Sequence, residues 1–187
     1  MDKKEAIRLA AIKVFAENGF HKTTTDSIAE EAGVAVGTIY NYFQNKQDVL
    51  EHIFAVEYEK REYFYEKLKQ KDLHPVEKIS QIIEKHFTEV KESPGLIKII
   101  LTERHLARSC FPKREGLRRF MEEIIVAGKK EGTISDIDPE ILAVMLFGTI
   151  EAVMAEYLAR EGERDRGDIF KRAQQEIVKL LKRGLSR

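Results

Sequence analysis

The chain has 187 residues, 43% of them hydrophobic, which suits one or two domains with a buried core and excludes a largely disordered protein. Its 32 Lys and Arg residues balance its 32 Asp and Glu residues, so net charge points to no class of partner. The single cysteine, Cys110, excludes an intramolecular disulfide framework. The amphipathic N-terminus is not a secretory signal and the apolar run 141–150 is too short to span a bilayer, so we expect a cytoplasmic protein without a membrane partner.

Helical periodicity runs through almost the whole chain, and its first part predicts three helices. Apolar residues at helical spacing over 7–15 form the first stripe, which Gly19 closes as a C-cap. Thr25 is placed to cap a second helix, which ends at Gly33. A third, short helix follows within residues 33–46. This part of the chain therefore predicts a compact three-helix unit.

The next segments predict four further helices. Asn45 caps a long fourth helix, whose apolar residues continue as far as Leu68. Pro75 suits the first position of a fifth helix, a sixth covers residues 96 to about 109, and Pro112 opens a seventh. No hairpin turn lies between alternating apolar residues, so the predicted fold class is all-α with about nine helices.

The eighth predicted helix begins at Asp138, a cap followed by a first-turn proline, and runs through residues 141–158. Its only acids are Glu151 and Glu156, and apolar residues lie all round it, which is typical of a helix buried on several sides. A partner subunit can cover what a small chain cannot. The eighth helix and the ninth helix, residues 169–181, therefore predict a homodimer through the last two helices.

The segment 33–46, GVAVGTIYNYFQNK, is unusual because no charge occurs in it before Lys46. Its apolar positions follow one helical face, and the opposite face shows small and hydrogen-bonding side chains. Two short helices joined through a glycine, with a third ahead of them, form a helix-turn-helix arrangement, whose second helix enters the major groove of DNA. The candidate groove residues are Ala35, Val36, Gly37, Thr38, Asn41 and Tyr42. Thr25 and Lys46, at predicted helix N-termini, are placed to hold phosphates.

The segment 23–50, TTTDSIAEEAGVAVGTIYNYFQNKQDVL, resembles the DNA-binding region of the TetR/AcrR family of bacterial transcriptional regulators, and AAIKVFAENGFHKT before it matches the family's first helix and loop. The resemblance implies a DNA-binding domain over residues 1–46 and a ligand-binding and dimerisation domain over 47–187. It implies a homodimeric repressor, released from operator DNA by a small molecule, and not an enzyme. The alternative is a helical carrier or enzyme that retains the fold without regulating DNA.

The resemblance also assigns roles to single residues. Thr25 corresponds to a phosphate-binding cap, Tyr42 to an aromatic residue that binds backbone phosphate, and Lys46 to the lysine that opens the fourth helix. Gly37, Thr38 and Asn41 correspond to groove-facing positions, and Tyr40 and Phe43 to residues that partly support the core. Val36 stands where many relatives carry Lys, Arg or a polar residue, so it can contact a thymine methyl group but cannot read guanine.

Charge sets the expected strength of the phosphate contacts. Residues 1–50 hold six Lys and Arg against seven Asp and Glu, so this segment is not basic overall. We therefore expect few phosphate contacts in each subunit and a modest dependence of DNA affinity on salt.

A second set of residues is apolar and lies in the predicted fifth to eighth helices. The candidates for an effector cavity are Phe87, Ile97, Ile100, Leu101, Phe120, Met121, Ile124, Phe147, Ile150 and Met154. Taken singly, each is better explained as ordinary core, because close packing is the default in proteins. As a set they suit an apolar or amphipathic small molecule.

The basic run 104–119 is either a solvated loop or an anion site at the mouth of such a cavity. The segments LTERHLA and FGTIEAVMAEYL resemble those of acyl-CoA-responsive repressors of fatty-acid degradation within the family. This resemblance implies a long-chain acyl-CoA effector, with its phosphates near Arg104 and Arg108. The histidine spacing predicts no metal site, and no catalytic constellation or cofactor other than the effector is expected.

Overall fold

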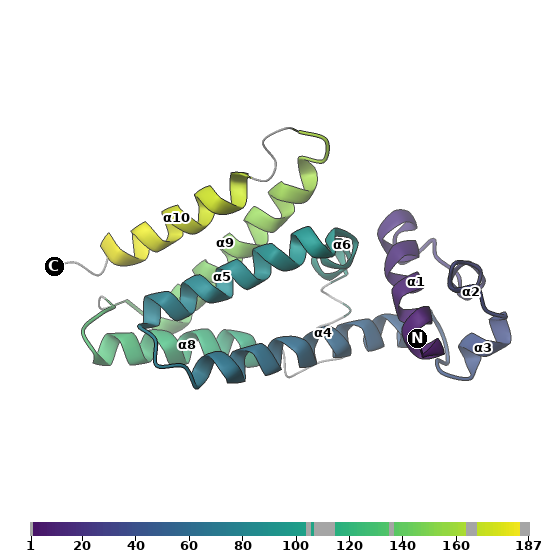
Figure 1. The fold of residues 1–187 in the computed structure, drawn as a ribbon, viewed down its shortest axis with the longest axis horizontal. Helices are drawn as coiled ribbons and strands as arrows, with labels where there is room; N and C mark the ends of the chain where they lie inside the picture. The colour runs from purple at the N-terminus through teal and green to yellow at the C-terminus, as the bar shows by residue number, and fades with distance from the viewer. Residues whose placement is uncertain (1, 104–105, 107–114, 135–136, 164–167, 184–187) are drawn as a thin grey trace. The chain divides into compact units, whose positions relative to one another are not determined.

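The computed structural model describes residues 2–103, 106, 115–134, 137–163 and 168–183 (Figure 1). Across these residues it contains nine α-helices and no β-strand, which confirms the all-α prediction. The chain forms two compact units. Unit 1 comprises Met1–Arg61 and Ser93–Pro112, and unit 2 comprises Glu62–Glu92 and Lys113–Arg187. The functional boundary at 46/47 is a different division of the chain and stays a prediction.

Unit 1 is built from α1 (Lys3–Asn18), α2 (Thr25–Ala32), α3 (Val36–Tyr40), the first part of α4 (Lys46–Lys69) and α6 (Pro94–Thr102). One apolar face of each helix contributes to a shared core, as helical periodicity predicts. The core includes Ile7, Ala11, Phe15, Ile28, Ile39, Phe43, Leu50, Ile53, Leu96 and Ile99. The four short helices and the start of α4 are therefore held by one set of buried side chains.

Local capping fixes where the first helices end. Gly19 has φ 77°, and its N–H donates to the carbonyl of Phe15 at 2.9 Å, so the predicted C-cap of α1 is confirmed. Gly33 adopts the left-handed conformation with φ 65° and ends α2, again as predicted. The Asn45 side chain accepts from the N–H of Asp48 at 3.0 Å, which confirms the cap of α4.

The predicted cap of α2 was wrong by one residue. Thr24, not Thr25, is the N-cap: its hydroxyl accepts from the N–H of Ser27 at 3.1 Å. The Ser27 hydroxyl in turn accepts from the N–H of Thr24 at 3.2 Å, which completes a capping box. Thr25 becomes the first residue of the helix, so its hydroxyl is not used to cap the backbone.

The helix α6 packs against the C-terminal half of α1. Lys98 Nζ donates to the carbonyl of Ala16 at 2.7 Å, and a Cβ added to Gly95 would lie 3.1 Å from the Cβ of Ala16. The helix ends at Thr102, with the N–H of Glu103 donating to Ile99 at 2.8 Å. It is therefore shorter than the predicted 96–109, and residues 104, 105 and 107–109 lie outside the described part.

Unit 2 contains the second part of α4 with α5 (Pro75–Glu92), α8 (Glu115–Lys130), α9 (Pro139–Ala159) and α10 (Asp168–Arg183), drawn from blue-green to yellow in Figure 1. Aromatic rings form much of its core. The ring pairs are Tyr65–Phe120, Tyr65–His86, His86–Phe147, Phe87–Phe170 and Tyr157–Phe170. Because these pairs join α4, α5, α8, α9 and α10, they hold unit 2 together.

The helix α9 begins as predicted, with Pro139 in its first turn and the Asp138 side chain accepting from the N–H of Ile141 at 3.0 Å. By length and composition alone it is the one helix, among those described, that could cross a membrane. Its buried residues are Leu142, Ala143, Leu146, Ile150 and Met154. Since this face packs into unit 2, we treat α9 as a core helix with a second, exposed face.

Candidate functional site

The exposed surface of α3 and the turn after it collects the small and polar residues of the 33–46 segment. Ile39 is fully buried and Phe43 is 3% exposed, so these two side chains anchor the segment to the unit 1 core. Ala35, Gly37 and Asn41 are exposed, and Tyr42 is 41% exposed. Thr38 and Val36 are half-buried, and Val36 packs partly against the core. The predicted groove residues thus share one region, with Val36 the least available of them.

The expectation that Tyr40 supports the core was wrong. Tyr40 is 55% exposed, and its hydroxyl lies 3.1 Å from the hydroxyl of Thr25. Ile39 is the fully buried residue of α3, and Tyr40 lies about 100° further round the helix, so its side chain is exposed. The turn after α3 brings Phe43 back to the core. The two hydroxyls form an exposed polar pair beside the N-terminus of α2, where backbone N–H groups of the first turn have no intrahelical acceptor.

Lys46 lies at the start of α4, as predicted, but its ammonium group is engaged within the protein. Nζ donates to the carbonyl oxygens of Phe20 at 2.9 Å, His21 at 3.0 Å and Thr23 at 2.9 Å. It also lies 4.8 Å from the centroid of the Phe20 ring. A lysine ammonium has three donors, and in this structure all three are used.

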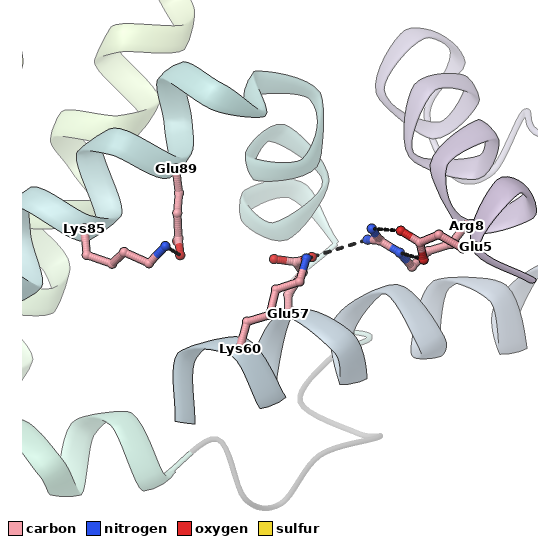
Figure 2. A network of polar contacts seen from close by, with 6 residues as sticks. All are labelled: Glu5, Arg8, Glu57, Lys60, Lys85 and Glu89. Atoms are coloured by element: carbon pink, nitrogen blue, oxygen red, sulfur yellow. Dashed lines mark hydrogen bonds and ion pairs between the residues drawn. The ribbon is translucent and has the colours of Figure 1, made fainter. Parts of the chain in front are cut away.

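A buried ion-pair network joins α1 to α4, as Figure 2 shows. The Arg8 guanidinium donates to Glu5 at 2.7 and 2.8 Å and to Glu57 at 3.3 Å, and Lys60 donates to Glu57 at 2.8 Å. Arg8 is 5% exposed and Glu57 6%. The hydrogen bond from Arg8 lowers the pKa of Glu5, and the same bond raises the pKa of Arg8. Arg8 therefore stabilises the unit and is not available to DNA.

Another basic residue of the first fifty is also paired internally. Lys13 on α1 donates to both carboxylate oxygens of Glu31 on α2, at 2.8 and 2.9 Å. Glu31 raises the pKa of Lys13 through this bond. In contrast, Lys22 is exposed in the loop before α2. With Arg8 and Lys46 also engaged, residues 2–50 present fewer cationic groups to DNA than their composition indicates.

The predicted effector residues belong to both units. Phe87, Phe120, Met121, Ile124, Ile150 and Met154 are buried in unit 2, and Phe147 is half-buried there. Ile97, Ile100 and Leu101 belong to α6 of unit 1, with Ile97 buried and the other two half-buried. Arg104 and Arg108 lie outside the described residues.

One buried polar pair interrupts the apolar core of unit 2. The Tyr65 hydroxyl lies 3.4 Å from His86 Nε2, and His86 Nδ1 lies 2.8 Å from the carbonyl oxygen of Ile82. Tyr65 is 5% exposed and His86 6%. Sequence reasoning did not single out this pair, although a histidine on the apolar face of a predicted helix was the available signal.

An open groove of about 590 Å³ lies along the exposed face of α9. Its lining residues are Met145, Gly148, Thr149, Ala152, Val153, Glu156 and Ile169. None of the predicted effector residues lines it. It lies instead on the helix pair that the sequence assigned to dimerisation.

Comparison with known protein families finds two models that match this chain. The profile of "bacterial regulatory proteins, tetR family" matches residues 7–53, and that of a "tetracyclin repressor-like, C-terminal domain" matches residues 72–181. The chain belongs to the TetR family. The resemblance found in the sequence is thereby confirmed, and this TetR-family chain is a DNA-binding transcriptional regulator whose helix-turn-helix is the α2–α3 pair.

Individual relatives show which regulators of the family this chain is similar to. The "fatty acid metabolism regulator protein" of Bacillus subtilis is 32% identical over 167 residues, 83% of this chain and 84% of the relative. The fatty acid degradation regulator FadR of Bacillus halodurans has a TM-score of 0.81 at 27% identity, covering 95% of both chains. FadR of Bacillus subtilis, solved in complex with stearoyl-CoA, has a TM-score of 0.80 at 28% identity, covering 96% of this chain and 98% of its own. This TetR-family chain is therefore similar to regulators of fatty acid metabolism along nearly its whole length.

Proposed function

We propose that this TetR-family regulator is a homodimeric repressor that reads its operator with the exposed surface of α3 and is released from it by a long-chain acyl-CoA. The observation that carries the proposal is the α3 surface. Buried Ile39 and Phe43 fix it, while Gly37, Asn41 and Tyr42 remain exposed. Small residues allow close approach to base edges, and amide and phenol groups supply hydrogen bonds to bases and phosphates. Operator DNA lies in the bacterial cytoplasm, which is where we expect the protein to act.

The exposed face of α9 supports the homodimer. Its large apolar residues include Ile141 at 54% exposed, Val144 at 47% and Met145 at 56%. On α10, Leu180 is 71% exposed. Four apolar side chains on two neighbouring helices are costly in water, and a second copy of the same pair would cover them in a four-helix interface. Two α3 helices one turn of DNA apart would then meet a palindromic site, with half-sites ~34 Å apart.

Similarity to the FadR proteins supports the effector. Relatives at 27–32% identity are named for fatty acid metabolism or degradation, and one was solved with stearoyl-CoA. The core of unit 2 is rich in aromatic and aliphatic residues, which suits a site for an acyl chain. The relatives are regulators, so we expect no catalytic activity from this chain.

A shift assay with DNA upstream of the regulator's own gene tests DNA reading by α3. Gly37 is exposed, and a Cβ added there meets no atom within 4 Å, so Gly37→Glu should fold normally. It would place a carboxylate against the DNA phosphates and should abolish binding. Ala127→Glu, on the exposed face of α8, is the matched control and should bind as the wild type does. Equal binding by both variants would contradict the role of α3.

The dimer is tested by light scattering after size exclusion. A Cβ at Gly148 meets no atom within 4 Å, so Gly148→Lys is compatible with the isolated subunit but places a charge on the exposed face of α9. We expect this variant to run as a folded monomer, while Ala127→Lys remains a dimer. A wild-type monomer, or a dimeric Gly148→Lys protein, would rule out this interface.

The effector is tested by calorimetry and by release of bound DNA. Stearoyl-CoA should bind and release the DNA, whereas CoA alone should lack the affinity contributed by the apolar chain. If stearoyl-CoA neither binds nor releases DNA while the protein still binds its operator, the acyl-CoA proposal fails and the regulator itself stands. Chemical turnover of stearoyl-CoA without DNA binding would instead favour the alternative of an enzyme that retains the fold.

A further inference from the structure

We propose that Lys46 is a positioning residue for DNA binding: its ammonium group holds the loop ahead of α2 in place and does not itself bind a phosphate. This reverses the role that the resemblance assigned to it. The inference rests on the DNA-binding function of the family and not on the proposed effector or dimer. Its evidence is the set of partners that the side chain already has.

The Nζ atom of Lys46 already has a full set of protein partners. Three carbonyl oxygens, of Phe20, His21 and Thr23, accept from it at 2.9, 3.0 and 2.9 Å. The Phe20 ring lies on another side, 4.8 Å away from centroid to Nζ. These carbonyls belong to a loop between helices, where no helical N–H is in register to pair with them. A phosphate could bind Nζ only if a carbonyl were released.

Further contacts with α1 and with Gly19 hold the same loop in place. The Thr23 hydroxyl, in a residue only 2% exposed, donates to the carbonyl of Gly19 at 2.9 Å. The Phe20 ring lies 5.4 Å from that of Phe15. Together with Lys46, these contacts fix the backbone that leads straight into the capping box of Thr24 and the exposed hydroxyl of Thr25. Lys46 thus connects the first residue of α4 to the loop that leads into α2.

The dependence of DNA affinity on salt distinguishes positioning from contact. Each phosphate neutralised by a lysine releases counterions and steepens the plot of log K against log salt by about 0.9. The groups that Lys46 would position, a hydroxyl and backbone N–H groups, are neutral. Loss of a positioning lysine should therefore lower affinity at every salt concentration without changing the slope.

The test uses the full-length protein and the DNA fragment that it shifts, with Kd measured between about 50 and 300 mM salt, a range over which a phosphate contact is readily resolved. Lys46→Met keeps most of the apolar stem and removes the ammonium. Its Kd should rise about tenfold, the loss expected when a helix start loses its support, with an unchanged slope. Lys22→Met, in the same loop, removes an exposed lysine and shows how far one lost charge alone alters the slope.

A second variant keeps the proposal testable if Lys46→Met does not fold. Lys46→Arg retains the charge, but a planar guanidinium cannot donate to three carbonyls gathered around one nitrogen. We expect its affinity to fall as well, and amide exchange at residues 21–27 to speed up. Wild-type affinity in Lys46→Arg, or a slope in Lys46→Met that is lower by about 0.9 for each bound subunit, would overturn the proposal in favour of a direct phosphate contact.

Discussion

The helices α3 and α9 both leave one face uncovered, but the two faces differ in chemistry. In unit 1, α3 exposes Gly37 and the turn after it exposes Asn41 and Tyr42, all small or polar. In unit 2, α9 exposes Ile141, Val144 and Met145, all apolar. A surface for DNA must satisfy hydrogen bonds, whereas a surface for another protein chain gains from removing apolar area from water. This contrast is the basis on which we propose DNA as the partner of unit 1 and a second copy of the chain as the partner of unit 2.

Buried polar groups differ between the units as well. Unit 1 holds a charged network, with Arg8 and Glu57 at its centre. Unit 2 instead holds the pair Tyr65 and His86 among aromatic rings. Charged pairs need defined geometry to offset their desolvation, so they favour one arrangement of the helices that carry them. We infer that unit 1 requires a fixed arrangement of α1 and α4 to present α3.

The largest expected effect comes from the core of unit 1. Ile39→Ala should lower the free energy of unfolding by about 3–4 kcal/mol and strongly reduce DNA binding, because Ile39 is fully buried and anchors α3. Ile150→Ala in α9 removes an equally buried side chain from unit 2 and should cost a similar amount. Denaturant unfolding and anisotropy with labelled DNA measure both. If Ile150→Ala impairs DNA affinity as much as Ile39→Ala, the functional contrast between the units is lost.

A smaller effect is expected from the ion-pair network. Arg8→Met should cost about 2–3 kcal/mol, below the usual figure for a broken buried pair, because Glu57 keeps Lys60 and Glu5 is 41% exposed. A double-mutant cycle with Glu57→Gln isolates the pair itself. The coupling should appear in both unfolding and DNA affinity. A coupling energy near zero would show that the network does not fix α1 against α4.

The next effect concerns base reading alone. Asn41 is exposed at the end of α3, so Asn41→Ala should leave stability unchanged and weaken the binding free energy for the operator by about 1–2 kcal/mol. Binding to unrelated DNA should change little, so the ratio of specific to non-specific affinity falls. Tyr42→Phe is the useful comparison, because loss of a phosphate-bonding hydroxyl should weaken both kinds of DNA alike. Identical, sequence-independent losses in the two variants would show that Asn41 does not read bases.

Helix ends were predictable because capping is local. Gly19, Gly33, Asn45 and Asp138 each act within a few residues of their own position, and the structure confirms all four. The family was recognisable for a related reason, since the helix-turn-helix segment is continuous in the chain.

The errors at Thr25 and Tyr40 arose where two local rules competed. Three consecutive threonines at 23–25 offer the same capping chemistry, and only the spacing to Ser27 selects Thr24. Tyr40 keeps the helical spacing from Val36, but it is the last residue of α3, next to the fully buried Ile39, and its side chain is exposed. A side chain at the last residue of a short helix cannot be assigned to a face from periodicity alone.

The hydrogen-bond partners of Lys46 and the surroundings of the effector residues could not be predicted from neighbouring residues in the chain. The three acceptors of Lys46 lie 23 to 26 residues away in the chain, so its destination depends on tertiary packing. Apolar side chains that line a cavity and those that fill a core have the same pattern in sequence, and the predicted set is divided between α6 of unit 1 and three helices of unit 2.

The smallest expected effect is a pH dependence within unit 1. Burial lowers the pKa of His52 from its ordinary value of 6.5, and the positive charges of Lys4 and Arg8 lower it further. The unfolded chain therefore binds more protons just below pH 6.5 than the folded chain does, so stability should fall as the pH drops through that range. His52→Gln should flatten this part of the curve. Glu5→Gln should act only at lower pH, because Arg8 lowers the pKa of Glu5 from 4.5. Denaturant unfolding from pH 7 downward separates the two windows, and an unchanged upper window in His52→Gln would show that another group is responsible.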